Sequence, residues 1–497
     1  MKRHLVRAGL AVAALTAVTG LAWAGAPPAS AEPECLNQSN DFDQDGGVDV
    51  AVGMPGADLS TGAVEVRVSD GEGSTVHRIE APDAQRGDEF GFAVAEVAAS
   101  GGEADQDRCS MLVVGAPGRD VGGAANAGAV FLYRWDAGAA GFALVGEYSM
   151  ATDGVPGQAQ AFARFGHALA APYHEGGEIG GLVTPLYVGV PRYSVGSAHW
   201  SGAFTRLTFT LDEDPAVDEG TLVTQDSAGI PDTAEQDDQL GDALAAVDGG
   251  VLVGAPGEQV GTVDWAGGFL RWREGDSGQA RFVTQDTPGV PGVPETGDEF
   301  GRAIYAAHEL KASGGGHFVM VGAPGESIGD VLRAGSAIRF VYDGELQVAG
   351  AQGFNQDTTG VAGRPEQDDA FGSAFGSYGP TRTLVGVPGE SVGTVGNAGL
   401  VQGLSGERSW QQDTAGVPGS VGIRHRFGAT IGNALYGLGG SGEDGWLGDV
   451  LVGVPGDDRF VGSVVAGLPG GPGGSERWTP QTPGDEDAYG SAVGRTN

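Results

Sequence analysis

The chain has 497 residues, including 92 glycines and 26 prolines, and its formal net charge is −38. Such an acidic chain repels nucleic acid and anionic lipid, which excludes both as expected partners. Hydrophobic residues make up 40% of the chain and occur in short runs between turn residues, a pattern typical of many short β-strands. After the first 31 residues, no apolar stretch is long enough to predict a membrane span.

The N-terminus has the pattern of a targeting segment. Lys2 and Arg3 precede an apolar run from Ala8 to Ala24, and Ala29-Ser30-Ala31 has the small-x-small form of a cleavage site. We therefore predict that residues 1–31 are a signal peptide and that the product is secreted and extracellular.

The remaining chain contains two cysteines, Cys35 and Cys109. An exported protein meets an oxidising compartment, where a pair of cysteines tends to form a bridge. We predict a disulfide between them, which would join two neighbouring repeats. The alternative is a pair of buried free thiols.

An acidic loop close to Cys35 carries the strongest chemical motif. It follows the pattern D-x-D-x-D-G-x-x-D, and its candidate metal ligands are Asp41, Asp43, Asp45, Gly47 and Asp49. Alternate carboxylates in a tight loop converge on one point, and hard oxygen ligands select calcium over softer metals. We predict a calcium site here, with an acidic turn that binds no metal as the alternative.

Two sequence elements recur along the whole chain. The first is a short apolar strand that ends in Gly-x-Pro, in seven copies 62 to 74 residues apart that begin at Gly53, Gly115, Gly189, Gly254, Gly322, Gly386 and Gly453. The second is an aromatic-Gly pair or a close variant, also in seven copies that begin at Phe90, Phe165, Leu240, Phe300, Phe371, Phe427 and Tyr489.

The spacing of these elements predicts four strands in each repeat. In the fifth repeat the expected strands are 300–306, 317–321, 335–342 and 345–348. The chain ends on the Tyr489 element, whereas the first repeat lacks its opening strand, so the last strand can complete the first repeat and close a ring. The predicted fold is therefore an all-β, seven-bladed β-propeller with four-stranded blades that occupies residues 32–497 as a single domain.

The loop that joins one repeat to the next is itself repeated. One copy reads Gln285-Asp-Thr-Pro-Gly-Val-Pro-Gly292, and Gln225, Gln356 and Gln412 begin three others. Asp and Thr side chains can bond the local backbone and Pro-Gly sets turns, which predicts a self-capped connection between blades. A functional ring of Asp side chains on one face is the alternative.

With seven Phe-Gly and Gly-Ala-Pro elements and a calcium loop, residues 42–497 resemble the FG-GAP repeats of the integrin α-subunit propeller and of secreted bacterial proteins. The resemblance implies a calcium-stabilised binding or adhesion module rather than an enzyme. It also implies an extracellular protein or glycan as partner, and we expect a monomer.

Two other functions stay open. The first is a secreted propeller hydrolase or lyase that uses carboxylates at the mouth of the central channel; the candidates are Asp298, Glu299, Asp368, Asp369, Glu486 and Asp487. Arg164 and His167 flank an aromatic-Gly pair and could line one end of that channel. The second is a self-associating coat protein.

Two matches to the G-x-S-x-G nucleophile elbow, around Ser327 and Ser391, are not interpreted as catalytic. The equivalent positions in other repeats hold Gln259 and Asp120, and the elbow requires a strand followed by a helix, which this pattern does not predict.

Overall fold

The computed structural model describes residues 41–494 outside a set of gaps, and all structural statements below refer to these described residues. The gaps are 44, 46, 70–72, 102–106, 173–184, 211–215, 276–279, 312–315, 379–381, 405–407, 434–449, 470–473 and 485. The predicted signal peptide, residues 1–31, and Cys35 lie outside the described residues. Within the described part of the chain, no helix has the length and apolar character needed to cross a membrane.

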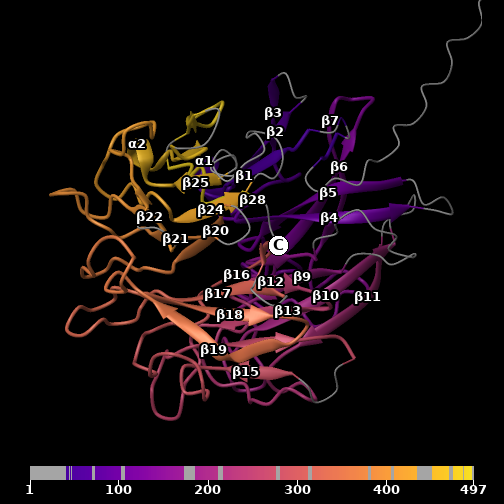
Figure 1. The fold of residues 1–497 in the computed structure, drawn as a ribbon. Coiled ribbons are helices and arrows are strands. Elements are labelled where there is room, and N and C mark those ends of the chain that lie inside the picture. Colours follow the sequence, from indigo (N-terminus) through magenta and orange to yellow (C-terminus); the bar gives the residue numbers. More distant parts are fainter. Residues whose placement is uncertain are drawn as a thin grey trace, which may run out of the picture. The chain divides into compact units, whose positions relative to one another are not determined.

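The described chain forms seven antiparallel sheets of four strands each (Figure 1). The first consists of β28 (Ala492–Gly494), β1 (Val50–Met54), β2 (Ala63–Ser69) and β3 (Ser74–Ile79). The second consists of β4 (Ala93–Gly101), β5 (Asp107–Ala116), β6 (Ala129–Asp136) and β7 (Gly141–Tyr148). The third consists of β8 (Leu169–Ala170), β9 (Leu186–Val190), β10 (Ala203–Thr210) and β11 (Ala216–Val223).

The other four sheets follow in chain order. The fourth consists of β12 (Leu244–Val247), β13 (Gly250–Ala255), β14 (Gly268–Trp272) and β15 (Arg281–Val283). The fifth consists of β16 (Ala303–Lys311), β17 (His317–Ala323), β18 (Ser336–Tyr342) and β19 (Leu346–Phe354). The sixth consists of β20 (Ala374–Ser377), β21 (Thr383–Val387), β22 (Leu400–Gly403) and β23 (Ser409–Trp410). The seventh consists of β24 (Thr430–Asn433), β25 (Val450–Val454), β26 (Ser463–Ala466) and β27 (Glu476–Trp478).

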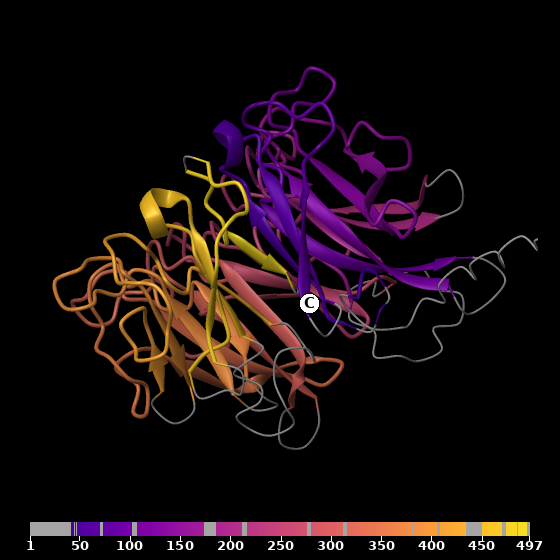
Figure 2. The same cartoon turned by 90° about the horizontal axis from the view of Figure 1, so that it is seen from above.

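The first strand of each sheet contacts the first strand of the next, and these contacts close into a ring. The order around the ring is β28, β4, β8, β12, β16, β20, β24 and again β28. The C-terminal strand closes the first sheet, with Ala51 opposite Gly494 and Gly53 opposite Ala492. The prediction of a seven-bladed propeller closed by the last strand is confirmed. Figure 2 shows β1 in indigo and the C-terminal segment in yellow side by side at this closure.

Short segments α1 (Ala57–Ser60) and α2 (Asp457–Phe460) follow the Gly-x-Pro strands of the first and seventh sheets. Each contains three residues with positive φ, so both are tight turns rather than regular helices. They occupy the same place in their repeats, directly after the end of the second strand.

Five of the strands that end in Gly-x-Pro are buried along their whole length. β1, β9, β13, β21 and β25 have no exposed residue, because a neighbouring sheet covers each of their faces. This explains why they read as continuous apolar runs rather than as the alternation of a half-exposed strand. The outer strands β7 and β11 contain several exposed positions.

The aromatic-Gly pairs join each sheet to the next. The first residue of every pair is fully buried and forms a bridge to a glycine at the start of the preceding sheet's third strand. Gly335 shows why glycine is needed there: its φ is +87°, and a Cβ would lie 2.3 Å from the backbone nitrogen of Phe371. The sequence analysis did not identify this second glycine series, although it occurs once in every repeat.

Candidate functional site

The predicted calcium loop brings three carboxylates together. Oxygen atoms of Asp41, Asp43 and Asp49 lie within 4.8 Å of one another, so this group could hold a metal ion. Asp49 accepts hydrogen bonds from the backbone N–H groups of Phe42 (2.7 Å) and Ser69 (3.0 Å). Burial raises the pKa of Asp49 to about 8. A compact, buried set of hard oxygen ligands fits the chemistry of calcium.

Asp45 and Gly47 are bonded to each other within the loop. Asp45 is exposed, and its Oδ1 accepts the backbone N–H of Gly47 at 2.7 Å, so these two residues shape the loop. Asp45 is not a member of the carboxylate group. The ring of Phe42 packs edge-on against Phe142 of the second sheet at 5.6 Å. The loop therefore links the first sheet to the second.

The predicted disulfide is not among the features of the described residues. Cys35 lies outside them. Of Cys109 only the backbone is described; it lies in β5, opposite Ala99 of β4. The described part of the chain contains no disulfide.

The six carboxylates predicted at the channel mouth do not form one cluster. Asp298, Asp369 and Asp487 are buried, and each accepts the backbone N–H of the residue three positions earlier, at 2.6, 2.5 and 2.5 Å. They cap the backbone of the segments that lead into the aromatic-Gly pairs. Asp368 forms a surface ion pair with Arg333. Glu299 is close to the mouth: its Oε2 lies 3.7 Å from Nε of Arg302, a mouth residue that is described below.

A buried polar cluster recurs at three of the seven interfaces between blades. The Nε2 of Gln225 donates to Glu258 at 2.7 Å, beside Asp238. The equivalent groups are Gln285, Glu326 and Asp298 at the next interface, and Gln356, Glu390 and Asp369 at the one after. Burial, followed by the charge of Asp238, raises the pKa of Glu258 to about 9.

At two other interfaces the equivalent cluster contains a cation. Arg119 stands where Glu258 stands in its repeat and pairs with Asp88 at 2.7 Å. At the seventh sheet, Asp457 takes that place and lies 2.8 Å from Arg477 and 3.5 Å from the Nδ1 of His425. These polar clusters belong to the architecture of the interfaces, which accounts for most of the buried carboxylates.

The channel mouth is formed by the residue that directly follows each aromatic-Gly pair. Around the ring these residues are Phe92, His167, Asp242, Arg302, Ser373, Ala429 and Ser491. The residue before each pair has a left-handed backbone, with φ between 53° and 65° at all seven positions. The chain turns at these residues; for example, the His167 N–H donates to the Arg164 carbonyl at 3.1 Å. This turn fixes the position of each mouth residue. Strained non-glycine residues of this kind often occur at functional sites.

Polar groups gather on one side of this mouth. The Nε2 of His167 lies 3.3 Å from one oxygen of Asp242, and Nη1 of Arg302 lies 3.6 Å from the other. Burial alone would raise the pKa of Asp242, but the hydrogen bond from His167 and the positive charge of Arg302 outweigh it and hold this pKa below its usual value. Asp242 is therefore a largely buried but ionised carboxylate.

The His167 ring is held from two other directions. It packs against Phe92 with 4.7 Å between ring centroids, and its Nδ1 lies 3.4 Å from Nε of Arg164. Arg164 also stacks over Phe92 and pairs with Glu89 at 2.6 Å. The sequence analysis named Arg164 and His167 but not Asp242 or Arg302. Aligning the repeats on the aromatic-Gly pairs would have placed all four residues together.

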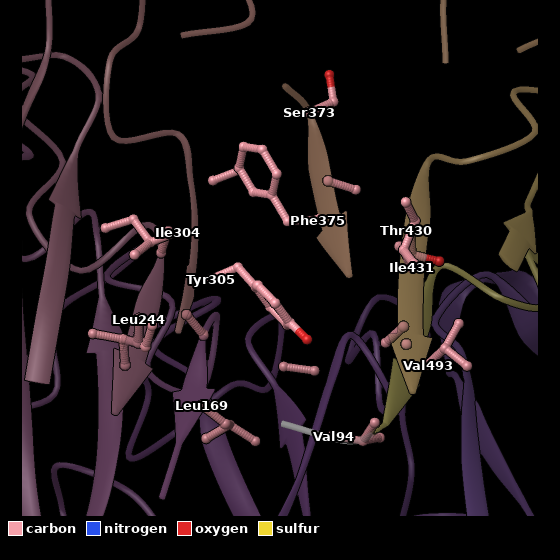
Figure 3. Close-up of a pocket in the computed structure, with 18 of the residues that line it drawn as sticks. Val94, Leu169, Leu244, Ile304, Tyr305, Ser373, Phe375, Thr430, Ile431 and Val493 are labelled. Carbon is pink, nitrogen blue, oxygen red and sulfur yellow. The ribbon is translucent and has the colours of Figure 1, made fainter. Parts of the chain in front are cut away.

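A cavity of about 320 Å³ lies directly below the mouth and is lined by the first strands of all seven sheets. Its lining begins with Phe92, Ser373 and Ala429 of the mouth and includes the residues that follow His167, Asp242 and Arg302. Figure 3 shows side chains such as Leu244, Ile304 and Phe375 around this cavity. A hollow lined mainly by apolar side chains, with a few polar groups at one edge, is a common form of a small-molecule site.

Comparison with known proteins gives fold-level matches only. No family model matches the chain, and no curated protein matches it. A proposed 6-phosphogluconolactonase from Bacteroides uniformis is 11% identical with a TM-score of 0.44, and the match covers 90% of this chain and 99% of that one. A periplasmic gluconolactonase from Pseudomonas aeruginosa is 13% identical with a TM-score of 0.44, over 88% and 97% of the two chains. A proposed 6-phosphogluconolactonase from Bacteroides fragilis is 13% identical with a TM-score of 0.42, over 92% and 99%.

These findings correct two predictions. The assignment to the FG-GAP repeats of integrins, and with it the adhesion role, is wrong: no family model matches, and the matched propellers named above are lactonases rather than integrins. The prediction that the chain is not an enzyme depended on that resemblance and is withdrawn with it; the solved structures named above carry the names of enzymes. At this overlap the comparisons describe the fold, and the site must be interpreted from its own residues.

Proposed function

We propose that this protein is a hydrolase of carboxylic esters, with its active site at the channel mouth. The observation that carries the proposal is the arrangement of His167, Asp242 and Arg302 at the edge of the central cavity. They come from three consecutive sheets, and no packing requirement of a propeller calls for a buried ionised carboxylate there. Ester hydrolysis includes the opening of lactones, the activity that the names of the matched gluconolactonases give.

His167 is assigned the role of general base. An ionised Asp242 fixes the proton on Nε2 of the imidazole, which leaves Nδ1 as the basic nitrogen. At 3.4 Å the contact of Nδ1 with Arg164 is at the limit of a hydrogen bond, so a water molecule can compete for it. Asp242 acts through His167 and is a positioning residue.

The reaction begins when His167 removes a proton from a water molecule as its oxygen attacks the ester carbonyl carbon. The carbonyl oxygen gains negative charge in the tetrahedral intermediate, and the guanidinium of Arg302 is placed to stabilise it. When the intermediate collapses, the bond between the carbonyl carbon and the alcohol oxygen breaks. Protonated His167 returns its proton to the departing alcohol, and the products are a carboxylic acid, which ionises, and an alcohol.

The carboxylates of Asp41, Asp43 and Asp49 are assigned to a structural calcium site. They precede β1, whose opposite end carries Gly53, the acceptor of the Gly490 N–H at the mouth. The ion would bind at the end of β1 away from the mouth and would stabilise the contact between the first two sheets. It takes no part in the reaction.

We also propose that the enzyme is secreted after removal of residues 1–31 and that it works as a monomer outside the cell. Mass spectrometry of the protein recovered from the culture medium would give a mature N-terminus at Glu32. Retention of residues 1–31 in that protein would contradict secretion by this route.

The function is tested by hydrolysis of p-nitrophenyl butyrate with the wild type, His167→Ala and a control variant, His199→Ala, which removes an exposed loop histidine. We expect His167→Ala to lower kcat by at least about a hundredfold and His199→Ala to retain full activity. Equal activity of His167→Ala and the wild type, with both proteins folded, would disprove the assignment.

A further inference from the structure

The cavity below the channel mouth has one apolar ring at its middle. The third residue after the glycine of each aromatic-Gly pair contributes to it, and all seven are hydrophobic: Val94, Leu169, Leu244, Ile304, Phe375, Ile431 and Val493 (Figure 3). Above this ring six of seven residues are alanine, and Thr430 is the seventh. The small residues leave open space between the mouth and the ring.

The few hydroxyl groups in the lining are already bonded to the protein. Tyr305 donates to the Oγ of Ser377 at 3.1 Å, Ser373 to the Ala370 carbonyl at 2.7 Å, and Thr430 to the Gly490 carbonyl at 2.6 Å. No charged side chain lines the cavity. The lining side chains therefore offer a polar ligand few hydrogen-bond partners in exchange for those it has in water, whereas an apolar chain needs none.

We propose that the channel binds the aliphatic chain of the substrate, so that the enzyme cleaves esters of apolar chains rather than polyhydroxylated sugar lactones. The ester group then sits at the mouth, beside His167 and Arg302, while the chain extends toward Ile304 and Phe375. The cavity is ringed by seven strands, and its ring of hydrophobic side chains suits an unbranched aliphatic chain. This inference rests on the proposed function for the position of the ester group, but binding of the chain itself is independent of catalysis.

The first test compares kcat/KM for p-nitrophenyl acetate, butyrate, hexanoate and octanoate. Burial of each methylene group should raise kcat/KM by about fourfold until the cavity is full. Ala374→Leu and Ala243→Leu place larger side chains in the lining and should remove this gain. Ala139→Leu, at an exposed turn, is the matched control.

The second test measures binding without chemistry, by calorimetric titration of decanol into the wild type, His167→Ala and Ala374→Leu. We expect decanol to bind the first two equally and Ala374→Leu at least tenfold more weakly. Decanol binding without ester hydrolysis would disprove the proposed function and leave the apolar site standing. Absence of decanol binding, or equal binding to all folded variants, would overturn the inference about the channel. Circular dichroism and melting curves confirm that each variant is folded.

Discussion

The guanidinium of Arg119 lies 2.7 Å from the carboxylate of Asp88, and both side chains are buried at the interface between two blades. In three other repeats the position of Arg119 holds a glutamate that faces an aspartate. Equivalent interfaces between blades thus contain either a pair of opposite charges or a pair of acids. The consequences for stability differ, and each can be measured.

Replacing Arg119 by methionine should strongly destabilise the protein. Asp88 would keep its buried position but lose its cation, and breaking one partner of a buried ion pair costs about 3 to 5 kcal/mol. Urea denaturation monitored by circular dichroism measures the loss. The double variant Arg119→Met with Asp88→Asn should recover most of it, and equal stability of the single and double variants would contradict the importance of this pair.

The two-acid interfaces should make stability depend on pH. Burial raises the folded-state pKa of Glu258 to about 9 and that of Asp238 to about 7. Because both values lie above those of the unfolded chain, folding favours the protonated forms. The stability they contribute is complete at low pH and is lost as the pH rises through about 7 and then 9.

Glu258→Gln tests this dependence, because glutamine mimics the protonated acid. The acidic neighbours Asp232 and Glu235 add to the repulsion that the variant relieves. From about pH 6 to about pH 9 the wild type should lose at most about 4 kcal/mol through Glu258, and the variant should lose less. Glu219→Gln, at an exposed position of β11, is the control and should follow the wild type.

The glycines that contact the aromatic-Gly pairs give a matched comparison. Gly335 and Gly297 both have left-handed backbones, with φ of +87° and +85°, but only at Gly335 would a Cβ meet other atoms. Gly297→Ala should cost roughly 1 kcal/mol of unfolding free energy, the conformational term alone. Gly335→Ala should cost at least about 3 kcal/mol more because a blade must shift. Similar melting temperatures for the two variants would show that the interface between blades accommodates a Cβ at position 335 with little loss of stability.

The calcium proposal assigns different roles to aspartates that the sequence motif does not distinguish. Asp49→Asn and Asp43→Asn should abolish the rise in melting temperature on addition of calcium, because both belong to the three-carboxylate group. Asp45→Asn should retain most of it, because Asp45 bonds the Gly47 N–H instead. Differential scanning calorimetry with calcium and with a chelator distinguishes these outcomes. If no protein responds to calcium, the metal site does not exist.

Asp242→Asn tests how His167 is oriented. An amide can present its N–H group to Nε2 and favour the wrong tautomer, so kcat should fall by about 100- to 10,000-fold with little change in KM. A change in KM alone would assign Asp242 to substrate binding.

The repeat, the blade number and the closing strand could be predicted from the sequence, because each aromatic-Gly pair and each Gly-x-Pro turn is recognisable from a few consecutive residues. The strands expected in the fifth repeat correspond to β16 through β19, although the weakest, 345–348, is part of a longer strand, Leu346–Phe354. The site was harder to predict. His167 and Asp242 are 75 residues apart, and neither belongs to a catalytic motif; only their shared position after an aromatic-Gly pair connects them. The acids chosen as catalytic candidates were misplaced because Asp298 and Asp369 cap their own loops.

The pairing of β28 with β1 also sets an order of assembly. Sheets two to seven each consist of four strands that are consecutive in the chain, so each can form as soon as its own segment is available. The first sheet cannot be completed until residues 492–494 have been synthesised. Until then the nascent protein has an incomplete first blade, and the pairing of β28 with β1 is the step that closes the ring.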